Sequence, residues 1–201
     1  MGGCADSVLD SLGMILLQVL GGHGAGKSTL LSHMVGLSDE MGARLEDSAG
    51  KKSALTVFPV DGRLSVLVGD YLSSGTKRCR GLDAWWGVKN SFLIDVLQTC
   101  VCAPEKYGFV GLEGITVMTR KWHDRYMQLG YAPRYMLLEV TDAISIERIG
   151  RSVRTASRIL GAARLAAWLE SQGAWVWRVD ATAYPPDILA HAVLDWLRRD
   201  T

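Results

Sequence analysis

Short apolar runs alternate with amphipathic stretches along most of the chain. Nearly continuous apolar runs at residues 14–20, 107–112 and 135–140 predict buried strands, and a run at 175–179 predicts the last strand. Apolar residues at helical spacing predict helices from the end of the first loop to about residue 36, and at 84–99, 116–129, 142–150, 159–172 and from 185 to the C-terminus. Because strands that alternate with helices form parallel sheets covered on both faces, the pattern predicts an α/β fold.

A hairpin is predicted between two β-rich runs, residues 55–60 and 64–69. They flank Asp61-Gly62, a dipeptide typical of a tight turn. Pro59 cannot donate a backbone hydrogen bond to a ladder, so we expect the first run to be an edge strand. The sheet should therefore be mostly parallel, with a hairpin at one edge. Two polar segments are expected outside the sheet: 38–52 as a short helix or loop, and 70–83 as a loop.

Length and composition indicate one domain of ordinary size, at residues 14–201, after a short N-terminal extension at 1–13. The 22 Lys and Arg nearly balance the 21 Asp and Glu, so any nucleic-acid signal must be local. Cys100-Val101-Cys102 is expected to hold one buried and one exposed reduced thiol, and not a metal site. No apolar run approaches membrane-spanning length, and the N-terminus lacks the features of a secretory signal. We therefore expect a soluble cytoplasmic protein with no membrane partner.

One motif carries specific chemistry: the glycine loop, residues 21–29, with the sequence Gly21-Gly22-His23-Gly24-Ala25-Gly26-Lys27-Ser28-Thr29. It matches the phosphate-binding pattern G-x-x-x-x-G-K-[ST] and lies between a predicted strand and a predicted helix, as that pattern requires. Its backbone N–H groups and the helix N-terminus favour phosphate. Lys27 is expected to reach the β- and γ-phosphates of ATP, and the Ser28 hydroxyl to bind Mg2+. His23 occupies a variable position of this nucleotide-binding loop and is assigned no chemistry of its own.

Phosphoryl transfer also needs an acid for the metal and cations for the developing charge. Glu113, at the end of a predicted buried strand, is the best candidate for a Mg2+ site. Glu139 and Asp180 are weaker candidates, and the alternative for Glu113 is an ordinary solvated acid. Arginines at 148, 151 and 154 predict a lid around residues 145–160, with Arg148 and Arg151 in catalytic roles and Arg154 at the nucleotide; the alternative is a solvated basic helix end.

A kinase that phosphorylates an alcohol usually needs a carboxylate to accept the proton. Asp83 is the first candidate and Asp70 the second, although an Asp before a helix is often only a cap. The segment between them combines positive charge with neighbouring aromatic rings, which suits a DNA backbone and an unstacked base. The alternative is a solvated loop with core tryptophans behind it. The residues concerned are Lys77, Arg78, Arg80, Tyr71, Trp85 and Trp86.

These motifs occur in a recognisable order: the glycine loop, Gly69-Asp70-Tyr71, Gly81-Leu82-Asp83, Leu112-Glu113-Gly114, Arg120-Lys121-Trp122, and the helix with Arg148 and Arg151. In this order the chain resembles the bacteriophage 5-hydroxymethyluracil DNA kinases and, more distantly, the polynucleotide 5′-hydroxyl kinases. The resemblance implies a P-loop kinase fold and ATP-dependent phosphorylation of the hydroxymethyl group of a modified uracil in DNA, in the host cytoplasm. It also implies that Asp83 lies near the acceptor, although the family's compact glycine-glycine-cysteine-aspartate turn is replaced here by Lys77-Arg78-Cys79-Arg80-Gly81-Leu82-Asp83.

Other activities compatible with the same motif are a nucleoside, nucleotide or other small-molecule kinase, a polynucleotide end kinase, and a nucleotide-dependent switch. No N-K-x-D run typical of guanine recognition is found, and the arginine-rich lid is more typical of kinases.

Overall fold

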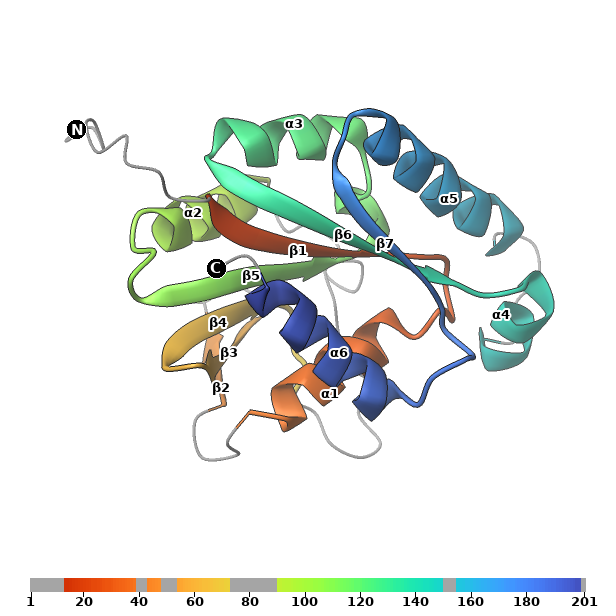
Figure 1. Ribbon diagram of the computed structural model, residues 1–201, viewed down its shortest axis with the longest axis horizontal. Helices are drawn as coiled ribbons and strands as arrows, with labels where there is room; N and C mark the ends of the chain where they lie inside the picture. Colours follow the sequence, from red (N-terminus) through yellow and green to blue (C-terminus); the bar gives the residue numbers. More distant parts are fainter. Residues whose placement is uncertain (1–12, 39–42, 48–53, 73–89, 150–154, 200–201) are drawn as a thin grey trace.

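The computed structural model describes residues 13–38, 43–47, 54–72, 90–149 and 155–199. Within them, one seven-stranded sheet has the order β2-β3-β4-β5-β1-β6-β7 (Figure 1). The five strands from β4 to β7 in this order run parallel, whereas β2, β3 and β4 pair antiparallel. The prediction of an α/β fold with a mostly parallel sheet is confirmed. The strands are β1 Met14–Leu20, β2 Arg44–Asp47, β3 Ala54–Val60, β4 Arg63–Val68, β5 Tyr107–Glu113, β6 Tyr131–Glu139 and β7 Trp175–Asp180.

Helices cover both faces of the sheet, as the pattern predicted (Figure 1). Helices α1 and α6 lie on one face, and α2, α3 and α5 lie on the other. The central strand β1 is apolar except for Gln18 because both of its faces are covered. Leu17 and Val19 belong to the core on the side of α1 and α6, and Leu16 and Leu20 belong to the cores on the opposite side. The helices are α1 Lys27–Gly36, α2 Asn90–Val101, α3 Arg120–Gln128, α4 Asp142–Ile149, α5 Thr155–Ser171 and α6 Pro186–Arg198, and a 3-10 turn, η2, spans Ile115–Val117.

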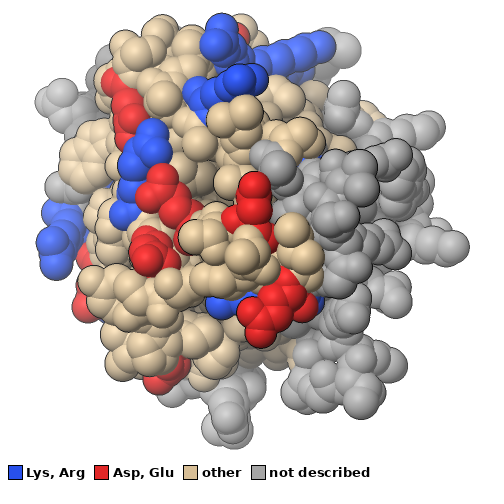
Figure 2. Space-filling view, turned by 90° about the vertical axis from the view of Figure 1, so that its right-hand side faces the viewer, with Lys and Arg blue, Asp and Glu red and all other residues tan. Residues whose placement is uncertain are grey.

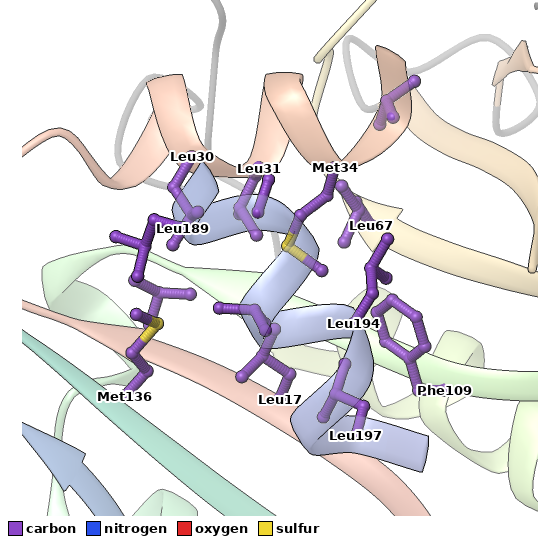
Figure 3. Close-up of a cluster of buried hydrophobic side chains, with 14 of the residues drawn as sticks. Leu17, Leu30, Leu31, Met34, Leu67, Phe109, Met136, Leu189, Leu194 and Leu197 are labelled. Carbon is purple, nitrogen blue, oxygen red and sulfur yellow. The ribbon is translucent and has the colours of Figure 1, made fainter. Parts of the chain in front are cut away.

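The core beneath the glycine loop is formed by α1, α6 and the sheet (Figure 3). Leu31 and Met34 of α1 point toward Leu194 of α6 and toward the sheet, and all three side chains are buried. Full burial of one such side chain contributes about 2 kcal/mol relative to exposure. This packing fixes the direction of α1, and therefore the direction in which its N-terminus points.

The predicted hairpin is present between β3 and β4. Its turn residues Asp61 and Gly62 both have positive φ, 51° and 79°, as a tight Asp-Gly hairpin turn requires. The prediction that the first run is an edge strand was wrong, because β2 pairs with the outer side of β3. That pairing ends at Val57, two residues before Pro59, so the proline lies beyond the ladder that it would interrupt.

Three boundaries also differ from prediction. Part of segment 38–52, expected as a short helix or loop, forms strand β2. Strand β6 begins at Tyr131, four residues earlier than predicted. Helix α3 begins at Arg120 because the Thr119 hydroxyl accepts a hydrogen bond from the Trp122 N–H and caps the helix. The first part of the helix predicted at 84–99 lies outside the described residues.

The state of the cysteines and the character of the helices also bear on the predictions. Cys100 is buried and Cys102 is exposed, and both are reduced thiols, as predicted. Among the helices within the described ranges, none combines the length and the apolar character that a membrane span needs.

Candidate phosphate- and metal-binding site

The glycine loop joins the end of β1 to the start of α1, at the edge where parallel strands end. Gly26 caps the helix with φ 91°, a left-handed conformation that residues with a Cβ rarely adopt. The next N–H groups begin α1 and are the ones that a helix leaves free for an anion. The Lys27 side chain folds back over the loop, and its Nζ donates to the carbonyl oxygens of Gly21 at 3.1 Å and of Gly22 at 2.9 Å. A positive charge is thus held inside the ring of loop backbone.

Helices α4 and α5 hold the loop from outside. The buried Ser145 hydroxyl of α4 donates to the His23 carbonyl, and Arg148 Nη1 donates to the Gly24 carbonyl at 3.0 Å. At Gly22, a Cβ would lie 2.3 Å from a side-chain carbon of Ile159 in α5, so only glycine allows this approach. The part of the predicted lid that the structure describes therefore contacts the loop directly.

Glu113 is the last residue of β5 and pairs with Val19, next to the point where β1 enters the glycine loop. Its side chain is 3% exposed. The Ser28 hydroxyl donates to Glu113 Oε1 at 2.5 Å, and the Tyr71 hydroxyl donates to the same oxygen at 3.1 Å. Two hydroxyl donors offset part of the hydration that a buried carboxylate loses. Of the three acids considered for a metal, this one contacts the loop serine.

A cleft of about 930 Å³ opens over these groups. It is lined by the glycine loop with Lys27 and Ser28, by Glu113 and by Arg148. Another part of its wall is the segment that joins β7 to α6, residues 181–186. Asp180 organises this wall, because its Oδ1 accepts hydrogen bonds from the Thr182 N–H at 2.8 Å and the Thr182 hydroxyl at 2.6 Å. These bonds lower the pKa of the Asp180 carboxyl.

The cleft suits a magnesium–nucleotide complex in size and in donor chemistry. Its volume lies within the range of small-molecule sites. Mg2+ in such sites is usually held by one or two carboxylates together with substrate phosphates and a hydroxyl. Within the described residues, no cluster of three or more His, Cys, Asp and Glu side chains that could hold a metal by itself is present. Ser28 and Glu113, which contact each other, are the described groups that could bind Mg2+ together with a nucleotide.

The two weaker metal candidates, Glu139 and Asp180, bind other residues. Glu139 is exposed and forms an ion pair with Arg178 at 3.1 Å. Asp180 is occupied by Thr182. Asp70, the second candidate for the general base, is half-buried at the end of β4 and directly precedes Tyr71.

One expected role was wrong. Tyr71 was grouped with the aromatic rings of a DNA-binding loop, but its side chain is 1% exposed and binds Glu113, so it cannot stack on a base. The other predicted residues of that surface lie outside the described residues, together with Asp83, Arg151 and Arg154. They are Lys77, Arg78, Arg80, Trp85 and Trp86.

Several contacts of the site were not predicted. Ser145 and Tyr71 carry no motif, and both contact the site across long sequence separations. Gln18 is also new: it is buried in β1 and donates to the Val117 carbonyl at 2.7 Å, which fixes the turn after Glu113. A polar residue inside an otherwise apolar strand was the available signal for Gln18, because a buried amide needs a partner.

Comparison with known proteins gave no relative: no family model matches the chain, and the search of the curated proteins returned no match. Function therefore has to be inferred from the fold, the site and the order of the motifs.

Proposed function

We propose that the protein is an ATP-dependent P-loop kinase that phosphorylates an alcohol, and that the acceptor is the 5-hydroxymethyl group of 5-hydroxymethyluracil in DNA. The observation that carries the first part is the hydrogen bond between Ser28 and Glu113. It joins the serine of the phosphate-binding motif to a buried acid at the end of the neighbouring parallel strand. P-loop NTPases hold Mg2+ with the Ser or Thr of the loop and an Asp, and Glu113 would supply the equivalent carboxylate here.

The arrangement of donors supports nucleotide binding. ATP phosphates would bind the loop N–H groups and the Lys27 ammonium group, which now donates to the two loop carbonyls and can turn to a stronger acceptor. The base and ribose would lie toward residues 181–186, the wall of the cleft beyond the loop. Bound Mg2+ supplies charge neutralisation on the phosphates.

The chain's own groups would act on the transferred phosphoryl group. The acceptor oxygen attacks the γ-phosphorus, the bond from that phosphorus to the bridging oxygen breaks, and ADP leaves. The acceptor proton passes to a carboxylate, with Asp83 as the first candidate and Asp70 as the second. Lys27 and Arg148, which both donate hydrogen bonds to carbonyls of the glycine loop, would neutralise the negative charge that develops on the phosphoryl group.

The acceptor class rests on the resemblance to the bacteriophage 5-hydroxymethyluracil DNA kinases. Its support is the order of the motifs and the basic, aromatic segment around Lys77, Arg78, Arg80 and Trp85. Positive charge next to aromatic rings suits a DNA strand with one base unstacked.

The test is phosphate transfer from γ-labelled ATP to matched DNA duplexes that contain thymine or 5-hydroxymethyluracil. After transfer, the DNA is digested to nucleosides under conditions that spare a phosphate on the base. The expected result is label on the modified nucleoside alone. Lys27→Ala, purified in parallel, shows whether a contaminating kinase contributes.

Other outcomes assign other activities. Equal label on both duplexes, released with the 5′ ends, would indicate a polynucleotide end kinase. Label on free nucleosides or nucleotides but not on DNA would indicate a small-molecule kinase. ATP hydrolysis that no hydroxyl acceptor changes would indicate a nucleotide-dependent switch and would contradict the proposal.

A further inference from the structure

Tyr71 is a buried tyrosine whose hydroxyl ends at the candidate metal site. Its side chain is 1% exposed, and its hydroxyl donates to Glu113 Oε1 at 3.1 Å. The Ser28 hydroxyl donates to the same oxygen. The two donors come from different parts of the chain, so Glu113 is held from both the glycine loop and the end of β4.

The backbone of Tyr71 is also fixed. Its N–H donates to the Thr56 hydroxyl oxygen at 3.0 Å, and that hydroxyl donates to the Gly69 carbonyl at 2.7 Å. On the other side, the Ser32 hydroxyl of α1 donates to the Tyr71 carbonyl at 3.0 Å. Strand β3 and helix α1 therefore both set the position of Tyr71, and the buried ring packs in the core beneath the glycine loop. A hydroxyl placed this firmly can orient the group that it contacts.

Orientation matters for a carboxylate that binds a metal. A group that hydrogen-bonds to a ligating side chain fixes its rotamer, and its loss typically weakens metal binding about 10- to 100-fold. The direction of the Ser28 bond is also relevant, because a hydroxyl that gives its proton to Glu113 leaves its oxygen lone pairs available to a cation. Holding Glu113 in place therefore also aligns Ser28.

We propose that Tyr71 is a positioning residue for Mg2+: by fixing the Glu113 carboxylate, it sets the metal dependence of nucleotide binding. This inference rests on the proposed function, since it requires a magnesium–nucleotide complex in the cleft. Tyr71 itself does not touch the metal or the nucleotide. The competing interpretation is that Tyr71 only fills the core and that its buried hydroxyl uses Glu113 as a hydrogen-bond acceptor, with no effect on metal binding.

The experiment is calorimetric titration of ADP into the protein, once with excess Mg2+ and once with EDTA, for wild type and Tyr71→Phe. Phenylalanine keeps the ring in the core and removes only the hydroxyl. The expected result is a loss of ADP affinity of about tenfold with Mg2+ and no change in EDTA. The matched control is Tyr126→Phe, because the Tyr126 hydroxyl is buried without a hydrogen-bond partner among the described residues. It should leave both affinities unchanged.

Each other outcome is informative. Equal affinities of wild type and Tyr71→Phe with Mg2+ would overturn the inference and leave the proposed function standing. A loss of equal size with Mg2+ and in EDTA, or a large fall in melting temperature, would make Tyr71 a purely structural residue. If wild type does not bind ADP under either condition, the nucleotide site itself is wrong, and both proposals fail.

Discussion

At the scale of single residues, Lys27 is the group whose removal should be most damaging. Its Nζ lies inside the loop, 2.9 Å from the Gly22 carbonyl, where it can follow the γ-phosphate. We expect Lys27→Ala to lower kcat for phosphate transfer at least about a hundredfold, since one lost transition-state donor commonly costs that much. The control is Lys106→Ala, because Lys106 directly precedes β5, at the end of the strand opposite to Glu113. A Lys27→Ala enzyme with nearly wild-type kcat would contradict the entire proposal.

A second residue-scale prediction separates the two candidate bases. If Asp83 accepts the acceptor proton, Asp83→Asn should lower kcat by about two orders of magnitude and change the dissociation constant of ATP little. Asp70→Asn should then have the smaller effect on kcat. Steady-state kinetics and equilibrium ATP binding measure the two quantities separately. The opposite ranking of the two variants would assign the proton to Asp70.

The sequence predicted the residues of the glycine loop and Glu113, because each has a local signature. It did not predict the contacts of Tyr71, Gln18 and Ser145, which reach partners 42, 99 and 122 residues away. Such contacts depend on how β1, β5 and α4 pack, and no pattern along the chain encodes that packing. Tyr71 was consequently assigned to a surface, although its ring fills the core.

At the scale of elements, apolar runs predicted the buried parallel strands well, because both faces of those strands are covered. They failed for β2, whose four residues Arg44–Asp47 are mostly polar and form a strand only by pairing with β3. They also missed the first residues of β6. There, buried Arg134 donates to the carbonyls of Trp196 and Leu197 at the end of α6, a tertiary contact that interrupts the apolar pattern.

The contact of α4 with the glycine loop supports a prediction at this scale. Ser145→Ala removes the buried hydroxyl that donates to the His23 carbonyl, which costs about 1 kcal/mol. If the loop must be held in shape to bind phosphate, ADP affinity should fall about fivefold. Ser171→Ala is the matched control, since its exposed hydroxyl bonds only to its sequence neighbours, the Trp168 carbonyl and the Gln172 side chain. Unchanged ADP affinity in Ser145→Ala would show that α4 does not shape the loop.

Arg178 of β7 forms ion pairs with Glu170 of α5 and Glu139 of β6, and the stability that the Glu170 pair contributes should depend on pH. Arg178 binds both oxygens of Glu170, at 2.8 and 3.0 Å, and this bond lowers the pKa of the Glu170 carboxyl. A carboxyl whose pKa is lowered by folding stabilises the protein above its ordinary pKa, and the effect is lost as the pH falls through the lowered pKa. We expect Glu170→Gln to reduce the free energy of unfolding by less than about 1 kcal/mol at pH 7, because the pair is exposed. Urea unfolding at a series of pH values should show this difference shrinking once the pH falls below the ordinary pKa of a glutamate. A difference that stays constant down to strongly acidic pH would contradict a stabilising role for the Glu170–Arg178 pair.

At the scale of the whole molecule, the charges are balanced, with 22 basic and 21 acidic residues. On the face shown in Figure 2, the described Lys and Arg side chains are interspersed with Asp and Glu side chains among uncharged residues. A protein whose total charges balance has little long-range attraction for DNA. If it binds DNA, the affinity must come from a local basic segment.

The local candidate for DNA binding is the basic segment with Lys77, Arg78 and Arg80. Replacing Lys77, Arg78 and Arg80 with alanine should weaken DNA binding and reduce the slope of log affinity against log salt by up to about 2 to 3, because each lost phosphate contact no longer releases a counterion. The matched control removes three exposed cations elsewhere on the protein: Arg125 of α3, Arg164 of α5 and Arg199 directly after α6. Binding is measured over a range of KCl concentrations with single- and double-stranded DNA that contains 5-hydroxymethyluracil. An equal change of slope in both triple variants would mean that DNA responds to net charge alone. An unchanged slope in the first would exclude residues 77–80 as the DNA contact and would favour a small-molecule acceptor.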